Sequence, residues 1–223
     1  MRPYVMLANI ISLDGCTTGF PANIGLYYGL VGQLGYDGHL FGSNTLITSG
    51  APADPPDVPP APPVEPTPGD TRPLGIAVDS RGRVRIWGAM RSEGYWRDFV
   101  SLCSKQTPAD HRAYLQSQGV EAVEVGEERI DLPTALDLLG ERYGVRRILV
   151  DSGGILNSVL LRAGLVDEVH LLMSPHLVGN ESAGAFYRSL PGFSPAETIS
   201  LHFDGLSQEA EGIVWLRYTV NRD

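Results

Sequence analysis

The sequence predicts an α/β fold: a mixed, mostly parallel sheet with helices on both faces and an antiparallel hairpin at the C-terminal end. Segments typical of strands and of helices alternate along the chain, as in strand–helix–strand units. The run from Arg147 to Val150 is apolar after its first residue, as expected of a strand buried on both faces of a parallel sheet. The final segment, Ile213 to Val220, indicates a half-buried strand of the hairpin. The residues expected on its apolar face are Val214, Leu216, Tyr218 and Val220.

The other elements follow from runs of apolar and β-branched residues bounded by turn residues, and from helical periodicity between those runs. Strands are expected at Tyr4 to Ser12, Asp37 to Phe41, Leu74 to Asp79, Phe99 to Cys103, Val120 to Val125, Arg147 to Val150, Val169 to Met173, Ile199 to Phe203 and Ile213 to Val220. Helices are expected at Leu26 to Leu34, just after Gly42, at Ala109 to Gln118, from Asp131 through Tyr143, and at Ile155 to Ala163.

The helix that ends at Tyr143 has the clearest boundaries. Asp131 is a suitable N-cap, and Pro133 is tolerated in the first turn. Gly144 ends the helix, because glycine readily adopts the left-handed conformation there. One apolar stripe predicts a buried face, made by Leu132, Leu136, Leu139 and Tyr143.

The length of 223 residues favours a single domain spanning residues 1–223. Hydrophobic residues make up 43% and charged residues 19%, which is typical of a globular protein and argues against wholesale disorder. The net charge of −9 repels phosphate and anionic lipid, so we expect neither nucleic acid nor a membrane as a partner. The apolar run near the N-terminus is broken by Asn9 and is too short to span a bilayer.

The cysteines and histidines give no sign of a metal site. Cys16 and Cys103 lack the spacing of a metal knuckle, and two cysteines fit a reducing cytoplasm better than a disulfide framework. We therefore expect a cytoplasmic protein. The five histidines are scattered without ligand spacing and are interpreted as structural or surface residues, namely His39, His111, His170, His176 and His202.

Residues 51–73 form a proline-rich insertion, in which ten of 23 residues are proline. Proline fixes φ and lacks a backbone N–H, so this stretch is neither a helix nor a central strand. Because strand-like segments lie on both sides, we interpret it as a surface loop inserted within the domain. A ligand for a proline-recognition module is the alternative.

One apolar strand ends in Asp151 and is followed by Ser152, Gly153, Gly154 and a helix. Ligands of open α/β sheets gather beyond the carboxyl ends of strands. Glycine lets an anion approach free backbone N–H groups at a helix start, here those of residues 155–157. By itself the pattern fits either a structural turn or an anion cradle.

Two other turns also follow strands and could bind an anion. Residues 42–45 (Gly-Ser-Asn-Thr) follow a strand and open a helix, either as a simple N-cap or as an anion site. Residues 79–83 place a hydroxyl and two guanidinium groups just after a strand, which suits a phosphate monoester or a solvated turn. Two anion-binding turns, at residues 42–45 and 153–157, and the cationic turn at residues 79–83 together suit a dinucleotide with an extra ribose phosphate, which is NADPH.

The chain resembles the reductases of riboflavin biosynthesis: the C-terminal domain of the bacterial bifunctional deaminase-reductase and the stand-alone archaeal pyrimidine reductases, which have a dihydrofolate reductase-like fold. The resemblance rests on an ordered set of motifs. They are Pro3-Tyr4-Val5, Ser12-Leu13-Asp14-Gly15, Gly42-x-x-Thr45, Val78-Asp79-Ser80-Arg81, Gly153-Gly154-x-Leu156-Asn157, the run from Leu160 to Glu168, Pro175-x-Leu177-x-Gly179 and Gly212-Ile213-Val214.

The resemblance implies an NADPH-dependent reductase domain that binds a small heterocyclic molecule. Hydride would add to C1 of a ring-opened ribosylaminopyrimidine phosphate. The pyrophosphate would lie at the second glycine turn and the 2′-phosphate near Ser80 and Arg81. The cofactor-binding residues are then expected to be Thr18, Gly42, Thr45, Ser80, Arg81, Gly153, Gly154, Ile155, Leu156 and Asn157. The resemblance also implies a homodimer.

This chain departs from the family on the substrate side. Cys16 stands where the family has a basic residue, and Asp151 replaces a glutamate that contacts the pyrimidine. The stretch that holds the ribose phosphate in the family is replaced by the proline-rich insertion, and the segment between Gly19 and Gly35 lacks a Ser-x-Trp-like element. The arginines that could bind the substrate's ribose phosphate in place of that stretch, as a phosphate clamp, are Arg72, Arg91 and Arg97.

Hydride transfer needs little acid–base chemistry from the protein. If a proton is delivered, Asp14 and Asp151 are the candidate catalytic residues, although Asp14 can also simply close a turn. Asp14, Cys16 and Asp151 are the candidate substrate-binding residues. Cys16 is either a small residue lining the pocket or a reactive thiol.

Three functions remain open from the sequence. The first is the riboflavin-pathway reduction of a (ribosylamino)pyrimidine 5′-phosphate. The second is reduction of a C=N or C=C bond in a pterin or secondary metabolite without a ribose phosphate. The third is a non-catalytic nucleotide-binding module.

Overall fold

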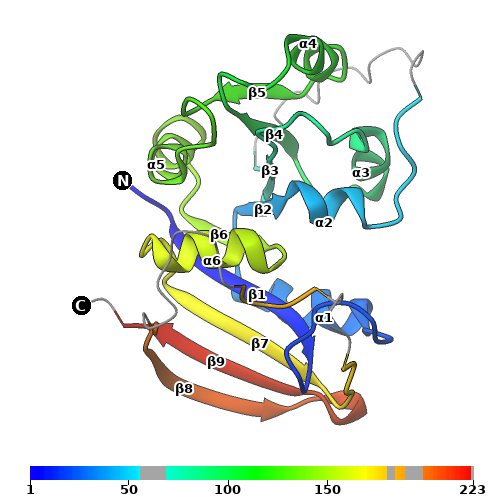
Figure 1. The fold of residues 1–223 in the computed structure, drawn as a ribbon, viewed down its shortest axis with the longest axis vertical. Helices are drawn as coiled ribbons and strands as arrows, with labels where there is room; N and C mark the ends of the chain where they lie inside the picture. Colours follow the sequence, from blue (N-terminus) through cyan, green and yellow to red (C-terminus); the bar gives the residue numbers. More distant parts are fainter. Residues whose placement is uncertain (56–68, 180–183, 189–197, 222–223) are drawn as a thin grey trace. The chain divides into compact units, whose positions relative to one another are not determined.

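The computed structural model describes residues 1–55, 69–179, 184–188 and 198–221 (Figure 1). Contacts divide the chain into two compact units. Unit 1 comprises Met1–Pro3 and Tyr36–Ile148, and unit 2 comprises Tyr4–Gly35 and Leu149–Asp223. Among the described residues, the strand order is β5-β4-β3-β2 within unit 1 and β6-β1-β7-β9-β8 within unit 2.

Unit 1 contains four parallel strands in consecutive pairs. They coincide with predicted strands to within one or two residues, because each is a short apolar run bounded by polar or turn residues. Their bounds are β2 (Gly38–Gly42), β3 (Leu74–Val78), β4 (Asp98–Cys103) and β5 (Glu121–Glu124).

Helices cover both faces of the sheet in unit 1: α2, α3 and α4 lie on one side of the strands and α5 on the other (Figure 1). Their bounds are α2 (Ser43–Ile47), α3 (Trp87–Glu93), α4 (Ala109–Ser117) and α5 (Leu132–Tyr143). The ends of α5 are as predicted: the Asp131 side chain accepts from the Thr134 N–H, and Gly144 has φ +67°. The predicted layering is therefore confirmed here.

Helix α3 was not predicted, because its N-terminal cap comes from a distant part of the chain. The main-chain N–H groups of Trp87 and Gly88 each donate to the Asp54 carboxylate at 2.8 Å. Trp87 and Met90 are buried, in a core cluster that also includes Phe99 and Leu115. Asp54 lies in the described start of the proline-rich insertion, and residues 56–68 lie outside the described residues.

Unit 2 contains the parallel pair of β1 (Tyr4–Ser12) and β7 (Glu168–Ser174) and most of β6 (Arg147–Asp151). The antiparallel hairpin of β8 (Leu201–Gln208) and β9 (Val214–Val220) is confirmed, and β9 also pairs antiparallel with β7. β8 begins later and runs further than predicted, because a register shift between Phe203 and Gly205 lets its pairing with β9 continue.

The predicted one-sided burial of β9 needs correction. Trp215, which points to the opposite face from Leu216, is only 6% exposed, whereas Leu216 and Tyr218 are half-buried. Both faces of this strand are thus partly covered.

The helices of unit 2 begin where a cap or a glycine permits. α1 (Ile24–Val31) starts two residues before the predicted position because the Asn23 side chain accepts from the Leu26 N–H, and a 3₁₀ turn (Gly32–Leu34) follows it. α6 (Gly154–Arg162) follows β6, and a second 3₁₀ turn (Ala210–Gly212) precedes β9. In the part of the chain that the structure describes, no helix combines the length and apolar character needed to cross a membrane.

Candidate functional site

Asp151 is the last residue of β6, and its side chain is buried. The Tyr28 hydroxyl donates to Asp151 Oδ2 at 2.8 Å. Burial raises the pKa of Asp151 from 3.8 to about 6, and the hydrogen bond from Tyr28 opposes that rise. A carboxyl group with a raised pKa of this kind is suited to proton transfer near neutral pH.

Tyr28 is a site residue that the sequence gave no reason to select. It lies on α1, far from Asp151 in the chain, and α1 is held in place because the Tyr27 hydroxyl donates to the Ala8 carbonyl at 2.9 Å. Contacts of this kind join segments distant in sequence, so no local motif reveals them.

The start of α6 has the features predicted for an anion cradle. Among the described residues, no acceptor contacts the N–H groups of Gly154, Ile155 and Leu156. A Cβ at Gly153 would meet no atom within 4 Å, and Ile155 is 52% exposed. Open space beside unpaired N–H groups at the positive end of a helix fits a phosphate.

Gly154 is required for a different reason. A Cβ at this position would lie 2.1 Å from the Ala185 carbonyl oxygen. The chain near Ala185 also pairs with the loop after β1, through a bridge to Cys16 and a hydrogen bond from the Phe186 N–H to the Gly15 carbonyl at 3.1 Å. The space that a side chain at Gly154 would need is thus filled by the protein's own Ala185 carbonyl.

Asn157 supports this turn from inside unit 2. Its Nδ2 donates to Asn9 Oδ1 and to the Phe186 carbonyl, both at 2.9 Å, and its Oδ1 accepts from the Ser152 hydroxyl. Asn9 in turn donates to the Ser152 carbonyl at 3.0 Å. Since the side chain is buried and fully engaged, this geometry favours a supporting role for Asn157 over the predicted direct contact with a cofactor.

Thr18 and Cys16 lie in the loop that follows β1. Thr18 Oγ1 accepts from the Gly184 N–H at 2.8 Å and keeps its own hydrogen to donate. Cys16 is a buried free thiol, and its main-chain N–H donates to Ser12 Oγ at 2.9 Å. Burial makes a small pocket-lining residue the better interpretation of Cys16 than a reactive thiol.

Asp14 has a structural set of partners. Its carboxylate accepts from the Ser12 hydroxyl at 2.5 Å, the Gly179 N–H at 2.7 Å and the Val178 N–H at 3.1 Å. These bonds, that from Ser12 first, lower its pKa to about 2. Asp14 therefore remains ionised and joins the Leu-Asp-Gly motif to the Pro-x-Leu-x-Gly motif, which makes it a poorer proton donor than Asp151.

The remaining predicted residues belong to unit 1. Because Gly42 pairs with Val78 in the parallel register, the turns after β2 and β3 lie at one edge of that unit's sheet. Thr45 is half-buried, Ser80 is half-buried and Arg81 is exposed. The sequence identified these turns, and the geometry brings them together within unit 1.

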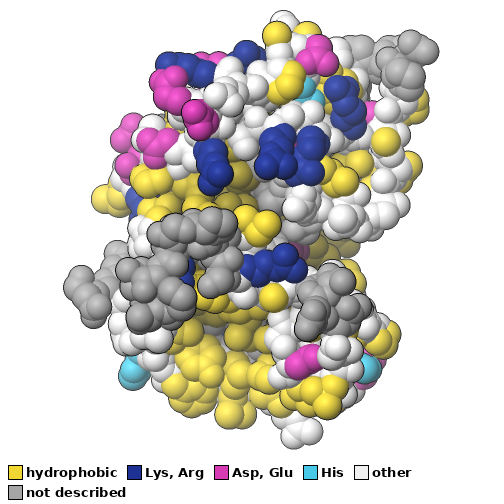
Figure 2. All heavy atoms as spheres, in the orientation of Figure 1, with side chains coloured by type: hydrophobic (Ala, Val, Ile, Leu, Met, Phe, Trp, Pro, Cys, Tyr) yellow, Lys and Arg dark blue, Asp and Glu magenta, His cyan; other side chains and the backbone are white. Residues whose placement is uncertain are grey.

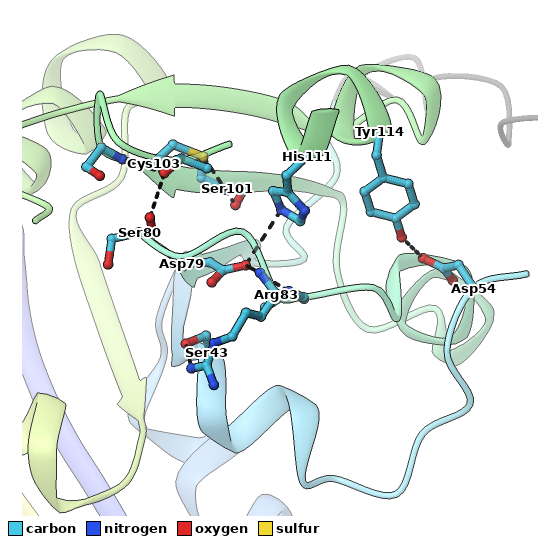
Figure 3. Close-up of polar contacts among 12 residues, drawn as sticks. Ser43, Asp54, Asp79, Ser80, Arg83, Ser101, Cys103, His111 and Tyr114 are labelled. Atoms are coloured by element: carbon cyan, nitrogen blue, oxygen red, sulfur yellow. Dashed lines mark hydrogen bonds and ion pairs between the residues drawn. The ribbon is translucent and has the colours of Figure 1, made fainter. Parts of the chain in front are cut away.

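Arg83 connects the two turns, although it was not selected as a site residue. Its Nη2 donates to Ser43 Oγ at 3.1 Å and to Asn44 Oδ1 at 2.7 Å (Figure 3). The signal available in the sequence was the second guanidinium group of the 79–83 cluster.

Arginines proposed as a replacement phosphate clamp are engaged elsewhere in unit 1. Arg72 is paired with Asp70 and donates to the Gly94 carbonyl at 3.0 Å. Arg91 donates to the carbonyls of residues 118 and 119 at 3.1 Å, and Arg97 reaches the Tyr143 carbonyl at 3.5 Å. Their contacts argue against such a clamp.

Comparison with known proteins identifies the family. The profile of the RibD C-terminal domain matches residues 35–214. The chain belongs to the RibD C-terminal domain family. The match includes β6, α6 and both turns of unit 1, so most of the predicted site lies within the RibD C-terminal domain as the family defines it.

Two reductases that share one name, from two organisms, are similar in sequence to this chain. The 2,5-diamino-6-ribosylamino-4(3H)-pyrimidinone 5′-phosphate reductase of Methanothermobacter thermautotrophicus is 32% identical over 190 residues, 82% of each chain. The enzyme of that name from Archaeoglobus fulgidus is 33% identical over 114 residues, so that this match spans 51% of the chain and half of the relative.

A solved structure confirms the fold of this RibD C-terminal domain protein. A pyrimidine reductase-like protein from Corynebacterium diphtheriae superimposes with a TM-score of 0.75 at 20% identity, over 99% of this chain and 93% of that one. The predicted α/β, dihydrofolate reductase-like fold class is confirmed.

Proposed function

We propose that this protein is an NADPH-dependent reductase that transfers hydride to a heterocyclic substrate, with a (ribosylamino)pyrimidine 5′-phosphate of riboflavin biosynthesis as the first candidate. The observation that carries the proposal is the alignment with the Methanothermobacter reductase over 82% of both chains. The proposal includes the predicted cytoplasmic location, the single domain of residues 1–223 and the homodimer.

Each unit, taken by itself, offers groups that suit a phosphate. The N–H groups of residues 154–156, which meet no acceptor among the described residues, and the open space at Gly153 suit a diphosphate. The Ser80 hydroxyl and the exposed Arg81 guanidinium suit a 2′-phosphate. When bound, NADPH supplies the hydride. The protein binds the cofactor and the substrate, orients them toward each other and excludes water from the site.

Asp151 is the proton donor of the proposal. With a pKa of about 6, it is partly protonated near neutral pH and can give a proton to the atom of the substrate's C=N or C=C bond that does not receive the hydride. Tyr28 holds one carboxyl oxygen and so fixes the orientation of the group. Asp14 is proposed to hold the loop after β1 in shape through its hydrogen bonds with Val178 and Gly179.

A second substrate class is favoured by one observation. Arg72, Arg91 and Arg97 are engaged by other parts of unit 1 and do not replace the missing ribose-phosphate clamp. A pterin or another heterocycle without that phosphate would not need the clamp. A non-catalytic nucleotide-binding module is the third possibility.

Three measurements separate these functions, two on the purified protein and one in cells. NADPH should raise the melting temperature more than NADH does at equal concentration, because a ligand that binds only the native state stabilises it. NADPH oxidation with the ribosylaminopyrimidine phosphate, and growth of a riboflavin auxotroph that lacks this reductase, test the first substrate. Stabilisation by NADPH without turnover of that substrate would point to the second class or to the non-catalytic module, and no effect of either nucleotide would contradict the proposal.

A further inference from the structure

A cavity of about 290 Å³ lies in unit 2, beside strands β7, β8 and β9. Glu168, which lines it, is the first residue of β7, and the parallel pairing of β7 with β1 runs from Glu168 to Ser174. Six residues of strand span about 20 Å, so the cavity lies at the other end of this pair from the loop after β1. It is therefore separate from the candidate site residues of that loop. Its lining residues are Glu168, His170, Asp204, Arg217, Tyr218 and Thr219.

Charged and polar side chains gather on one face of the sheet at this cavity. Glu168 pairs with Thr219, and His170 pairs with Arg217. Residues that pair across two strands point to the same side, as do alternate residues of one strand, so these four side chains share a face. The exposed apolar side chains of β8 pair with the intervening residues of β9 and lie on the opposite face.

Both carboxylates of the cavity are held by neighbouring groups. Glu168 accepts from the Tyr4 hydroxyl at 2.6 Å, and its other oxygen lies 2.9 Å from His170 Nε2. Asp204 lies at the register shift of β8, where a bulge can redirect a side chain, and it accepts from the Thr219 hydroxyl at 2.6 Å. A carboxylate has about four lone-pair sites, so each can accept further hydrogen bonds.

Arg217 is the cation of the cavity. It is half-buried, and its guanidinium carbon lies 5.4 Å from the centroid of the Trp215 ring. A Cβ at Gly205 would lie 3.2 Å from Nη2, so the glycine leaves room for the guanidinium. Among the described residues, no acceptor receives a hydrogen bond from Arg217, and neither carboxylate of the cavity forms an ion pair with it. Since arginine is always charged and such groups are ordinarily paired when partly buried, Arg217 is suited to hold an anionic group of a ligand.

We propose that this cavity binds a small zwitterion that carries a carboxylate and an ammonium group, as a free amino acid does. The carboxylate pairs with Arg217, and the ammonium group donates to Asp204 and Glu168. Charge selects this class, because a purely anionic ligand meets two carboxylates and a purely cationic ligand leaves Arg217 without a partner. A volume of about 290 Å³ is at the lower end for ligand sites, which suits a molecule of this size. The inference does not depend on the proposed function.

Calorimetric titration of the full chain tests the class of ligand. The probes are the standard L-amino acids, each alone, and three ions that carry one kind of charge: acetate, inorganic phosphate and methylammonium. At least one amino acid should bind saturably and about tenfold or more tightly than each of the three ions, because only the zwitterion makes both charged contacts. It should also shift the indole N–H resonance of Trp215, which the variant Trp215→Phe identifies in the NMR spectrum.

Two variants test the location. Arg217→Gln and Asp204→Asn should each weaken binding of that amino acid by about tenfold or more, because each removes one charged contact. Arg112→Gln is the matched control: it removes the same charge from an arginine of unit 1 that pairs with Glu124 at 2.5 Å, and it should bind the amino acid as the wild type does. Asp204 is exposed, so its variant decides the matter if Arg217→Gln does not fold.

Several results would overturn the inference. Saturable binding by none of the amino acids does so, and so does an acetate, phosphate or methylammonium affinity equal to that of the best amino acid. An affinity that is unchanged in the folded variants, with the Trp215 resonance unmoved, places the ligand elsewhere and also overturns it. Titration with NADPH reports on the proposed function separately, so either conclusion can fail while the other stands.

Discussion

Two aspartates of unit 2 differ in the groups that surround their carboxylates. Asp14 is exposed and accepts hydrogen bonds from Ser12, Val178 and Gly179, which favour the charged form. Asp151 is buried and accepts a hydrogen bond from the Tyr28 hydroxyl, and desolvation favours its neutral form. The sequence proposed both as proton donors, and only their surroundings distinguish them.

Replacing Asp151 should change how stability depends on pH. The pKa of Asp151 is raised in the folded state from 3.8 to about 6, so the wild type loses stability as pH rises from about 4 to about 6 while the buried carboxylate ionises. Asp151→Asn removes this loss. Its stability relative to wild type should therefore improve by up to about 3 kcal/mol between pH 4 and pH 8 in urea unfolding. A difference that does not change with pH would contradict the assigned pKa.

Tyr28→Phe provides the companion measurement. The hydrogen bond from Tyr28 lowers the pKa of Asp151, so its removal should move the midpoint of the pH dependence upward from about 6. If reductase activity is measurable, it should fall as pH rises through that midpoint, and the variant should show the same upward shift. A downward shift would contradict the role of Tyr28.

At the scale of elements, the turn between β6 and α6 uses its two glycines for different purposes. Gly153 faces open space, whereas Gly154 faces the Ala185 carbonyl. The sequence offered no reason to assign the two glycines different roles, because Ala185, which contacts Gly154, follows 31 residues later in the chain.

Alanine at each glycine should therefore give opposite results. Gly153→Ala should change the melting temperature little and weaken NADPH binding, because its φ of −82° suits alanine and the new methyl group would occupy the approach to the N–H groups. Gly154→Ala should cost about 1–3 kcal/mol of stability, because its Cβ would overlap the Ala185 carbonyl oxygen. Thermal unfolding and NADPH titration measure both effects, and equal stability losses in the two variants would contradict the assignment.

Elements with local signals were predicted well. Helix α5 has its own N-cap, its own C-terminal glycine and its own apolar stripe, so its bounds follow from adjacent residues. Helix α3 has a terminal glycine but no N-cap of its own, and its cap comes from Asp54, more than thirty residues earlier. Local pattern reasoning therefore had no means of finding it.

For the whole molecule, the exposed sheet face of unit 2 bears on the predicted homodimer. Leu201, Phe203 and Leu206 of β8 are 38%, 50% and 59% exposed. In the register of the hairpin, Phe203 pairs with Tyr218 and Leu206 with Leu216, so these side chains share one face. Figure 2 shows hydrophobic side chains gathered over this part of unit 2. Such a patch is typical of a surface that another molecule covers.

Charge on that face should therefore prevent dimer formation. We expect the wild type to elute with a mass twice its 24.1 kDa in light-scattering chromatography and Phe203→Glu to elute near 24.1 kDa, because burying a carboxylate in an apolar interface is costly. His202→Glu, whose side chain points to the other face of β8, should stay dimeric. A monomeric wild type or a dimeric Phe203→Glu would refute the predicted interface.

The sequence by itself determined the fold class, the order of most strands and helices, and the turns at which a cofactor is proposed to bind, because these depend on periodicity, caps and glycines among adjacent residues. Only the tertiary structure decided the burial that raises the pKa of Asp151, the partner of Gly154, and the contact between Arg83 and Ser43. Those properties depend on burial and on contacts between residues distant in the chain, and neither burial nor such contacts can be read from a local stretch of sequence.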